Sequence, residues 1–83
     1  MRERLGKMDY NNKIFTINNK KYLVMDTVIL DNKNYVFLIN KENEMDNQFK
    51  EIIHDGNLIL KNIESKLFQE KIYPLFLEKF KNY

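Results

Sequence analysis

The segment YVFLIN, residues 35–40, is the strongest predicted strand in the chain, and it is apolar on both faces. Side chains alternate between the two faces of a strand, so a sheet with one solvated face normally alternates apolar and polar residues. Here the apolar residues are Tyr35, Phe37 and Ile39 on one side and Val36 and Leu38 on the other. A sheet that contains this strand needs apolar cover on both of its faces.

The segment KYLVMDTVIL, residues 21–30, shows the same property over a greater length and contains neither glycine nor proline. Simple alternation sets Tyr22, Val24 and Val28 against Leu23, Met25 and Ile29. Asp26 and Thr27 interrupt the apolar run, which predicts a bulge or bend at that point. Such a bend would let one strand serve a curved sheet.

Turn residues separate this strand from its neighbours. Turns are expected at Asn18-Asn19, at residues 31–34 and at Asp55-Gly56, because Asn and Gly tolerate positive φ and favour tight hairpins. The strands that they join are residues 13–17, 21–30 and 35–40, followed by a hairpin that spans residues 49–62. A polar loop is predicted for residues 41–48.

From Ile63 onward the apolar period changes to three or four residues, which predicts an amphipathic helix. Its apolar stripe is Phe68, Ile72, Phe76, Phe80 and Tyr83. Asn62 or Ser65 is the expected N-cap. Pro74 lacks a backbone N–H and clashes with the preceding turn, so the helix is expected to kink or break near it.

These elements predict an α+β fold, in which a strongly bent antiparallel meander of four to five strands packs against one C-terminal helix. One helix covers one face of the sheet. The second apolar face must therefore curl on itself as a half-barrel, meet another copy in a homodimer, or meet another protein.

Residues 13–83 are expected to form a single domain after a flexible N-terminal tail, residues 1–12. The tail has no apolar core of the signal-peptide type, and no segment is long enough to cross a membrane. The chain has no cysteine, which favours a cytoplasmic location for so small a domain. Its net charge of +2 gives only weak support to nucleic-acid binding.

The chain offers little catalytic or metal-binding chemistry. Ser65 is placed for helix capping, and His54 adjoins a hairpin turn without an evident catalytic companion. The two glycines do not form a phosphate-binding loop. We therefore expect no enzyme activity, no catalytic residue, no metal and no cofactor.

Two binding hypotheses remain. In the first, the protein is a non-catalytic protein-binding module, a small inhibitor or accessory factor that binds a host protein through the uncovered sheet face or the helix. Tyr73 and Leu77 lie four residues apart outside the apolar stripe, and with Tyr83 they are the predicted partner-binding residues. In the alternative, Lys20, Lys21, Lys33 and Lys50 bind nucleic acid on the sheet surface.

The stretch KKYLVMDTVILDNKNYVFLINKENEMDNQFKEI resembles small uncharacterised proteins of low-G+C bacteria. These combine a K-Y-L-V-x-D strand, a Y-V-x-L-x-N strand, an I-H-D-G hairpin and a C-terminal helix. The resemblance runs from Lys13 to about Phe80, although Pro74 departs from the pattern. It implies a β-meander with one helix and supplies no functional residues. A weaker analogy of size and composition connects the chain with phage-encoded inhibitors of host defence.

Overall fold

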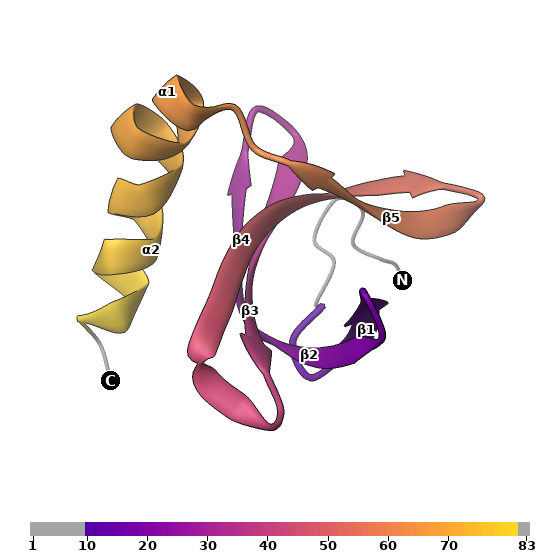
Figure 1. Cartoon of the computed structure of the whole chain (residues 1–83). Helices are drawn as coiled ribbons and strands as arrows, with labels where there is room; N and C mark the ends of the chain where they lie inside the picture. The colour runs from indigo at the N-terminus through magenta and orange to yellow at the C-terminus, as the bar shows by residue number, and fades with distance from the viewer. Residues whose placement is uncertain (1–9, 82–83) are drawn as a thin grey trace, which may run out of the picture.

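The computed structural model describes residues 10–81, which form a curled antiparallel sheet and one C-terminal helical segment (Figure 1). The strands are β1 Ile14–Ile17, β2 Lys20–Leu30, β3 Lys33–Asn40, β4 Asn43–Asp55 and β5 Asn57–Asn62. The helical segment comprises α1 Ser65–Leu67, the π-helical turn η1 Phe68–Ile72 and α2 Tyr73–Phe80. The sheet order β1-β2-β3-β4-β5 is a meander, so the predicted α+β fold is confirmed.

The turns follow the sequence signals closely. Asn18 and Asn19 adopt φ of 52° and 67°, and Gly56 adopts 74°. Asp31 and Asn32 are also in the left-handed region, so β3 begins at the next residue, Lys33. The polar loop predicted for residues 41–48 is wrong, because β4 already begins at Asn43 and leaves only a short turn before it.

The bulge predicted in β2 is present and has a definite position. Val24 pairs with Leu38, while Asp26 pairs with the adjacent residue Phe37, so Met25 is the extra residue. Leu38 and Phe37 point to opposite faces of β3, and their partners on β2 do the same. Val28, which pairs with Tyr35, therefore faces the opposite side from Val24, contrary to the simple alternation expected from the sequence.

The sheet curls so that its concave face encloses an apolar core of its own. This inner cluster consists of Tyr10, Tyr22, Val24, Val36, Leu38 and Ile52. Four partly buried side chains from the two edge strands pack against it: Phe15, Ile17, Leu58 and Leu60. The second apolar face is thus covered by the half-barrel that the sequence analysis gave as one of three outcomes.

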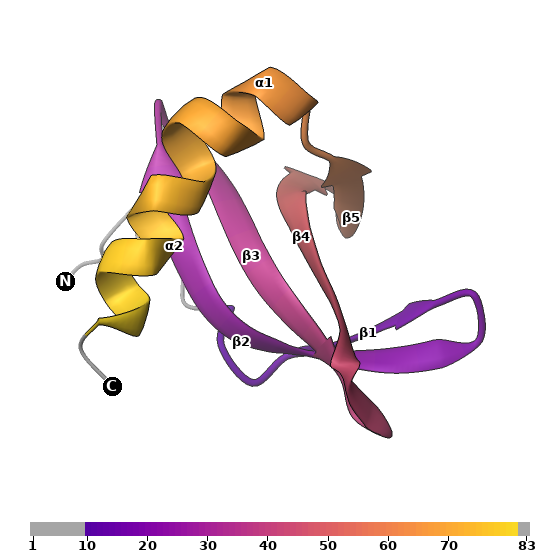
Figure 2. The same cartoon turned by 60° about the vertical axis from the view of Figure 1, so that its left-hand side comes forward.

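The helical segment covers the opposite, convex face, as Figures 1 and 2 show. The outer cluster there is centred on the buried residues Val28, Tyr35, Ile72 and Phe76. The stacked ring of Phe49 joins Phe37 to this layer, with ring centroids 4.7 Å apart. The two faces of the sheet therefore carry two separate cores.

The helix starts with a cap that the sequence analysis missed. The Glu64 side chain accepts a hydrogen bond from the backbone N–H of Leu67, at 3.3 Å. The prediction of Asn62 or Ser65 as N-cap is wrong. Asn62 still belongs to β5, where it pairs with Lys50.

The irregularity expected near Pro74 takes the form of a π-helical turn. The backbone N–H of Tyr73 bonds to the carbonyl of Phe68, five residues earlier, instead of following the α-helical pattern. Pro74 follows at the start of α2, where its missing N–H removes no α-helical bond of that segment. The helical segment thus continues through Pro74, with one widened turn before it.

The domain extends further toward the N-terminus than expected. Tyr10 is only 2% exposed and belongs to the inner cluster, and the backbone N–H of Asn12 bonds to the carbonyl of Val24 at 2.9 Å. Residues 10–12 of the predicted tail are thus part of the folded unit. The rest of that tail lies outside the described residues.

Candidate functional site

A group of partly exposed rings lies where the helical segment meets β4. We define the helix-side surface as the rings of Phe49, Phe68 and Tyr73 together with Leu77, which lies about one turn after Tyr73 on α2. The ring centroids of Phe49 and Phe68 are 4.9 Å apart, those of Phe68 and Tyr73 are 5.4 Å apart, and Tyr73 meets Phe49 edge-on at 6.0 Å. Such mutual packing holds the rings in fixed orientations.

Exposure divides the helix into a covered side and an open side. Ile72 and Phe76 are fully buried, whereas Tyr73 and Leu77 are each 40% exposed. The sequence placed these two residues outside the apolar stripe, and the structure places them at the solvent edge of the outer cluster. Tyr83, the third predicted binding residue, lies outside the described residues.

A shallow pocket continues the helix-side surface toward the start of the helix. Phe49, Ile63, Ser65 and Phe68 line it, and its volume is about 210 Å³. Phe49 and Phe68 were not among the predicted site residues. No local sequence signal indicates them, because Phe68 belongs to the predicted apolar stripe and Phe49 lies in a predicted strand like any residue that faces a core.

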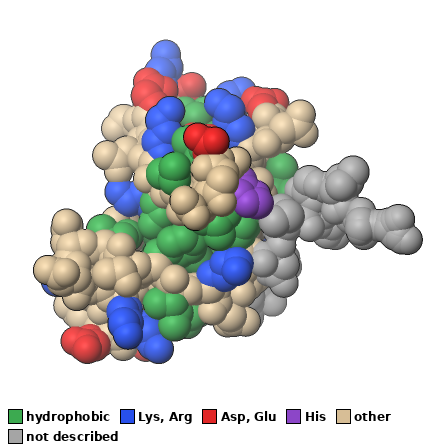
Figure 3. Space-filling model, turned by 90° about the vertical axis from the view of Figure 1, so that its right-hand side faces the viewer, with side chains coloured by type: hydrophobic (Ala, Val, Ile, Leu, Met, Phe, Trp, Pro, Cys, Tyr) green, Lys and Arg blue, Asp and Glu red, His purple; other side chains and the backbone are tan. Residues whose placement is uncertain are grey.

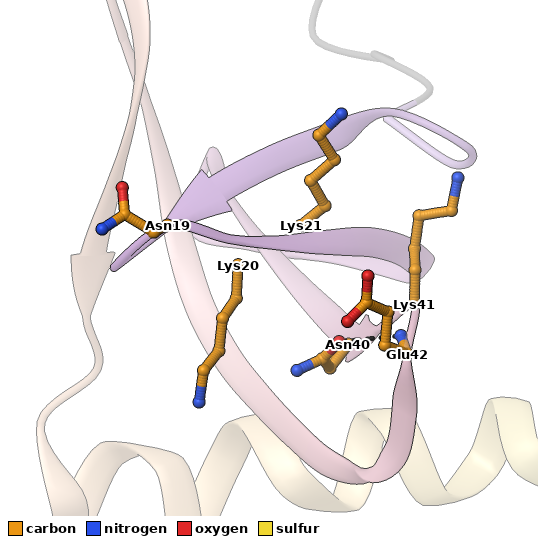
Figure 4. Close-up of a pocket in the computed structure, with 6 residues that line it drawn as sticks. All are labelled: Asn19, Lys20, Lys21, Asn40, Lys41 and Glu42. Carbon is orange, nitrogen blue, oxygen red and sulfur yellow. Dashed lines mark hydrogen bonds between the residues drawn. The ribbon is translucent and has the colours of Figure 1, made fainter.

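The four lysines of the nucleic-acid alternative do not form one patch. Lys20 and Lys21 adjoin Lys41, and together with Asn19, Asn40 and Glu42 they line a pocket of about 410 Å³ (Figure 4). Figure 4 shows Lys20 and Lys21 pointing to opposite sides of β2. Lys33 lies at the other end of the β2–β3 ladder, where it pairs with Leu30.

Lys50 lies on the concave face of the sheet and is not among the residues that line the pocket with Lys20 and Lys21. Its ammonium group donates a hydrogen bond to Oδ1 of Asn62. It also lines a groove of about 320 Å³ together with Phe15, Thr16, Ile17, Leu58 and Leu60. Figure 3 shows the molecule from the side on which β1 and β5 lie in Figure 1, and hydrophobic side chains gather at the centre of this view.

A polar network beside the lysine pocket ties the β3–β4 turn to β2. Oδ2 of Asp46 accepts hydrogen bonds from the Tyr22 hydroxyl at 2.7 Å and from Nδ2 of Asn40 at 3.1 Å. Oδ1 of Asn40 in turn accepts a bond from the backbone N–H of Glu42 at 2.8 Å. These contacts account for strand structure in a segment whose composition predicted a loop.

The same network changes how two of its members titrate. The hydrogen bonds from Tyr22 and Asn40, aided by the charge of Lys20, hold the pKa of the Asp46 carboxyl below its ordinary value. The hydrogen bond to Asp46, followed by burial and the carboxylate charge, raises the pKa of the Tyr22 hydroxyl. Both shifts favour the pair in which Asp46 is ionised and Tyr22 is neutral.

Residues with catalytic potential are spread through the fold. His54 is exposed on β4 beside the Gly56 turn, while Ser65 begins α1. Among residues 10–81 no three His, Cys, Asp or Glu side chains are grouped so that they could hold a metal ion. Within the same residues, no helix is long and apolar enough to cross a membrane.

The chain was compared with protein-family models, with curated proteins and with solved structures, and none of the three comparisons found a match.

Proposed function

We propose that this protein is a non-catalytic protein-binding module of the inhibitor or accessory-factor type, which acts in the cytoplasm on a host protein. The observation that carries the proposal is the helix-side surface. Tyr73 and Leu77 remain 40% exposed beside a packed set of rings, although the same helix buries Ile72 and Phe76 completely. Fixed, partly exposed aromatic side chains are typical anchors of protein interfaces.

Three features support binding of a protein through this surface. The rings of Phe49, Phe68 and Tyr73 hold one another in place, so little side-chain freedom would be lost on association. The shallow pocket next to them could receive one apolar side chain of a partner. Tyr73 also carries a hydroxyl group, which allows a hydrogen bond at the rim of an otherwise apolar contact.

The test is affinity capture from a host lysate with the native chain and with the double variant Tyr73→Asp, Leu77→Asp. We expect the native chain to retain a specific protein and the double variant to lose it. The matched control is Met45→Asp, which changes an 88% exposed apolar residue on β4 and should retain the partner. Folding of all three proteins is checked by circular dichroism.

If the folded double variant retains the same partner as the native chain, the helix-side surface is not the binding site. If the native chain and the control retain nothing that the double variant lacks, the proposal also fails. The mild variant Tyr73→Ala provides a further measurement if the double variant unfolds.

The alternative function is nucleic-acid binding, and its supporting observation is the grouping of Lys20, Lys21 and Lys41 around one pocket. Glu42 and the ionised Asp46 lie close to these lysines and reduce the local positive charge. Titration with mixed DNA and RNA at low and moderate salt discriminates the two functions. Salt-sensitive binding at micromolar protein would favour nucleic acid.

A further inference from the structure

The two edge strands of the sheet face each other across an apolar groove. β1 and β5 are the first and last strands of the five-stranded order, and within the described residues each pairs with one neighbour only. Phe15 and Ile17 from β1 and Leu58 and Leu60 from β5 are partly buried against the inner cluster. The same four residues line a groove of about 320 Å³ between the two strands.

The directions of the strands make this groove suited to one more strand. All four neighbouring pairs are antiparallel, so β1 and β5 run in the same direction. A segment that is antiparallel to β1 is then antiparallel to β5 as well. One inserted strand could therefore pair with both edges and close the half-barrel. Exposed edges of this kind are templates for strand addition.

The side chains in the groove define what such a strand must carry. The inward-facing positions of β5 are Leu58 and Leu60, and they are followed by Asn62. An antiparallel segment meets these residues in reverse order, first Asn62, then Leu60, then Leu58. It must therefore place apolar side chains at its third and fifth positions.

A positive charge lies at the end of the groove where the N-terminus of such a segment would lie. Lys50 pairs with Asn62 and donates one hydrogen bond to it, and an ammonium group has three donors. Lys20 pairs with Ile17 and so lies on the same face, near the end of β1, but the ionised Asp46 lies close to it, and Lys50 therefore carries the argument from charge. The residues that line the groove include Lys50 and no carboxylate. The first position of the segment should therefore be acidic.

We propose that the seam between β1 and β5 binds an extended segment of a partner protein with the pattern acidic-x-apolar-x-apolar, antiparallel to both edges. The groove lies on the opposite face of the sheet from the helix-side surface. Failure of this proposal would leave the proposal for Tyr73 and Leu77 intact, and the reverse also holds.

Charge argues against the two occupants that the chain itself could supply. The segment 1–9 contains Arg2, Arg4 and Lys7 against Glu3 and Asp9, so its net charge is positive. β5 of a second copy would bring Lys61 and no carboxylate, and β1 has no ionisable side chain. None of these segments places an acidic residue opposite Lys50 in the required order.

The test uses three synthetic peptides with blocked ends: acetyl-ETVTVT-amide, the lysine analogue acetyl-KTVTVT-amide and the reversed peptide acetyl-TVTVTE-amide. Each is titrated into the full chain up to about 1 mM, the weak end of measurable specific binding, and backbone amide signals are followed by NMR. We expect the first peptide to shift amides of β1 and β5 and to bind at least about tenfold more tightly than the other two. Absence of shifts in β1 and β5, or equal binding of the three peptides, would overturn the proposal.

A pair of charge-reversal variants makes the test specific to the groove. Lys50→Glu should invert the preference, so that the lysine peptide binds more tightly than the acidic one. Lys33→Glu makes the same change of charge at the far end of the β2–β3 ladder and should leave the preference unchanged. If both variants alter binding equally, general charge attraction explains the result, and the assignment of the binding site to the groove is wrong.

The other occupants have their own signatures in the same samples. Contacts between residues 1–9 and Leu58 or Phe15, detected by NMR without peptide, would assign the groove to the chain's own segment. A dimer in light scattering that dissociates in Leu60→Lys would assign it to a second copy. Either result overturns the proposal of a partner segment.

Discussion

Val24 and Asp26 lie two residues apart on β2, yet their side chains point to opposite faces of the sheet. The reason is the extra residue Met25, since Val24 pairs with Leu38 and Asp26 pairs with the adjacent Phe37. Val24 consequently enters the inner cluster, whereas Asp26 reaches Lys79 on the helix. This single bulge lets one long strand contribute to both cores.

Deleting Met25 should be tolerated better than deleting Thr27. Without Met25, β2 becomes a regular strand in which Val24 and Val28 keep their present faces, so we expect a loss below about 2 kcal/mol. Without Thr27, either Val28 leaves the outer cluster or Asp26 enters the inner one. We expect a loss of about 3 kcal/mol or more, because a buried Val side chain alone contributes about 1.5–3 kcal/mol.

Urea unfolding followed by circular dichroism measures both deletions. Met25→Ala is the control, because Met25 is 45% exposed and its truncation should change stability by no more than about 0.5 kcal/mol. Equal destabilisation by the two deletions would show that the bulge does not set the faces of β2.

The strands and turns of the sheet are predictable because each depends on the preferences of residues that are adjacent in the sequence. The two-sided pattern of YVFLIN is confirmed, since Tyr35 and Phe37 belong to the outer cluster and Val36 and Leu38 to the inner one. The face predicted for Val28 was wrong, because alternation cannot show which residue near Asp26 is the extra one. That choice depends on the pairing with β3, which is a tertiary property.

Other differences also have long-range causes. The segment around Asp46 looks like a loop, yet its polar groups bond to Tyr22 and Asn40, and these bonds hold it beside β2 and β3. Asn62 could not cap the helix because β5 uses it to pair with Lys50. Tyr10 was assigned to a tail because no local pattern shows that it fills the inner cluster.

The candidate surfaces were only partly predictable. Tyr73 and Leu77 lie outside the apolar stripe, which predicts their exposure, and their spacing of four residues places them on one helix face. The groove between β1 and β5 follows from the curl of the sheet, which was one of three predicted outcomes for the second apolar face. The odd number of strands, which makes both edges run in the same direction, is the signal that could have indicated it earlier.

The two sides of α2 should respond very differently to truncation. Phe76→Ala removes a fully buried ring that contacts Phe49 at 5.0 Å between centroids, and we expect a loss of about 3–5 kcal/mol. Leu77→Ala truncates a side chain that is 40% exposed and should cost below about 1 kcal/mol. Thermal and urea unfolding measure both changes.

Because a loss of that size could unfold so small a domain, Phe76→Leu serves as a milder variant of the same position. We expect it to cost less than Phe76→Ala and more than Leu77→Ala. A Leu77→Ala variant as unstable as Phe76→Leu would place Leu77 in the core and remove it from the helix-side surface.

The Tyr22–Asp46 pair should make stability depend on pH at both extremes. The pKa of Asp46 is lower in the folded protein than its ordinary value of 3.8, so its contribution is present above that value and is lost as pH falls through the folded pKa. The pKa of Tyr22 is raised above 10.0, so its contribution is present below that value and is lost as pH rises through the folded pKa. Stability from this pair is therefore greatest between the two limits.

Replacing Asp46 with Asn tests this dependence on pH. The variant cannot ionise at that position, so its urea midpoint should be lower than that of the native chain near neutral pH and should approach it in strong acid. The rise in the pKa of Tyr22 should also shrink, which ultraviolet titration of tyrosine detects. Asp55→Asn, at the β4–β5 turn, is the matched control. A constant difference between Asp46→Asn and the native chain from about pH 7 to about pH 2 would contradict the assignment.

The contact between Asp26 and Lys79 should be asymmetric in its effect on stability. Nζ of Lys79 lies 3.5 Å from Oδ1 of Asp26, but the lysine side chain is 48% exposed and the aspartate only 5%. Oδ1 of Asp26 also accepts a hydrogen bond from the backbone N–H of Thr27 at 3.0 Å. Lys79→Ala should therefore cost below about 1 kcal/mol, because solvent screens the exposed partner. Asp26→Ala should cost about 1–3 kcal/mol, because it also leaves the Thr27 N–H without this acceptor.

A double-mutant cycle of Asp26→Ala and Lys79→Ala, measured by urea unfolding, should give a coupling free energy of up to about 1 kcal/mol. Lys81→Ala, which removes an exposed contact with Glu78, is the control and should change little. If Asp26→Ala costs no more than Lys79→Ala, the hydrogen bond from the Thr27 N–H adds no measurable stability to that of the ion pair.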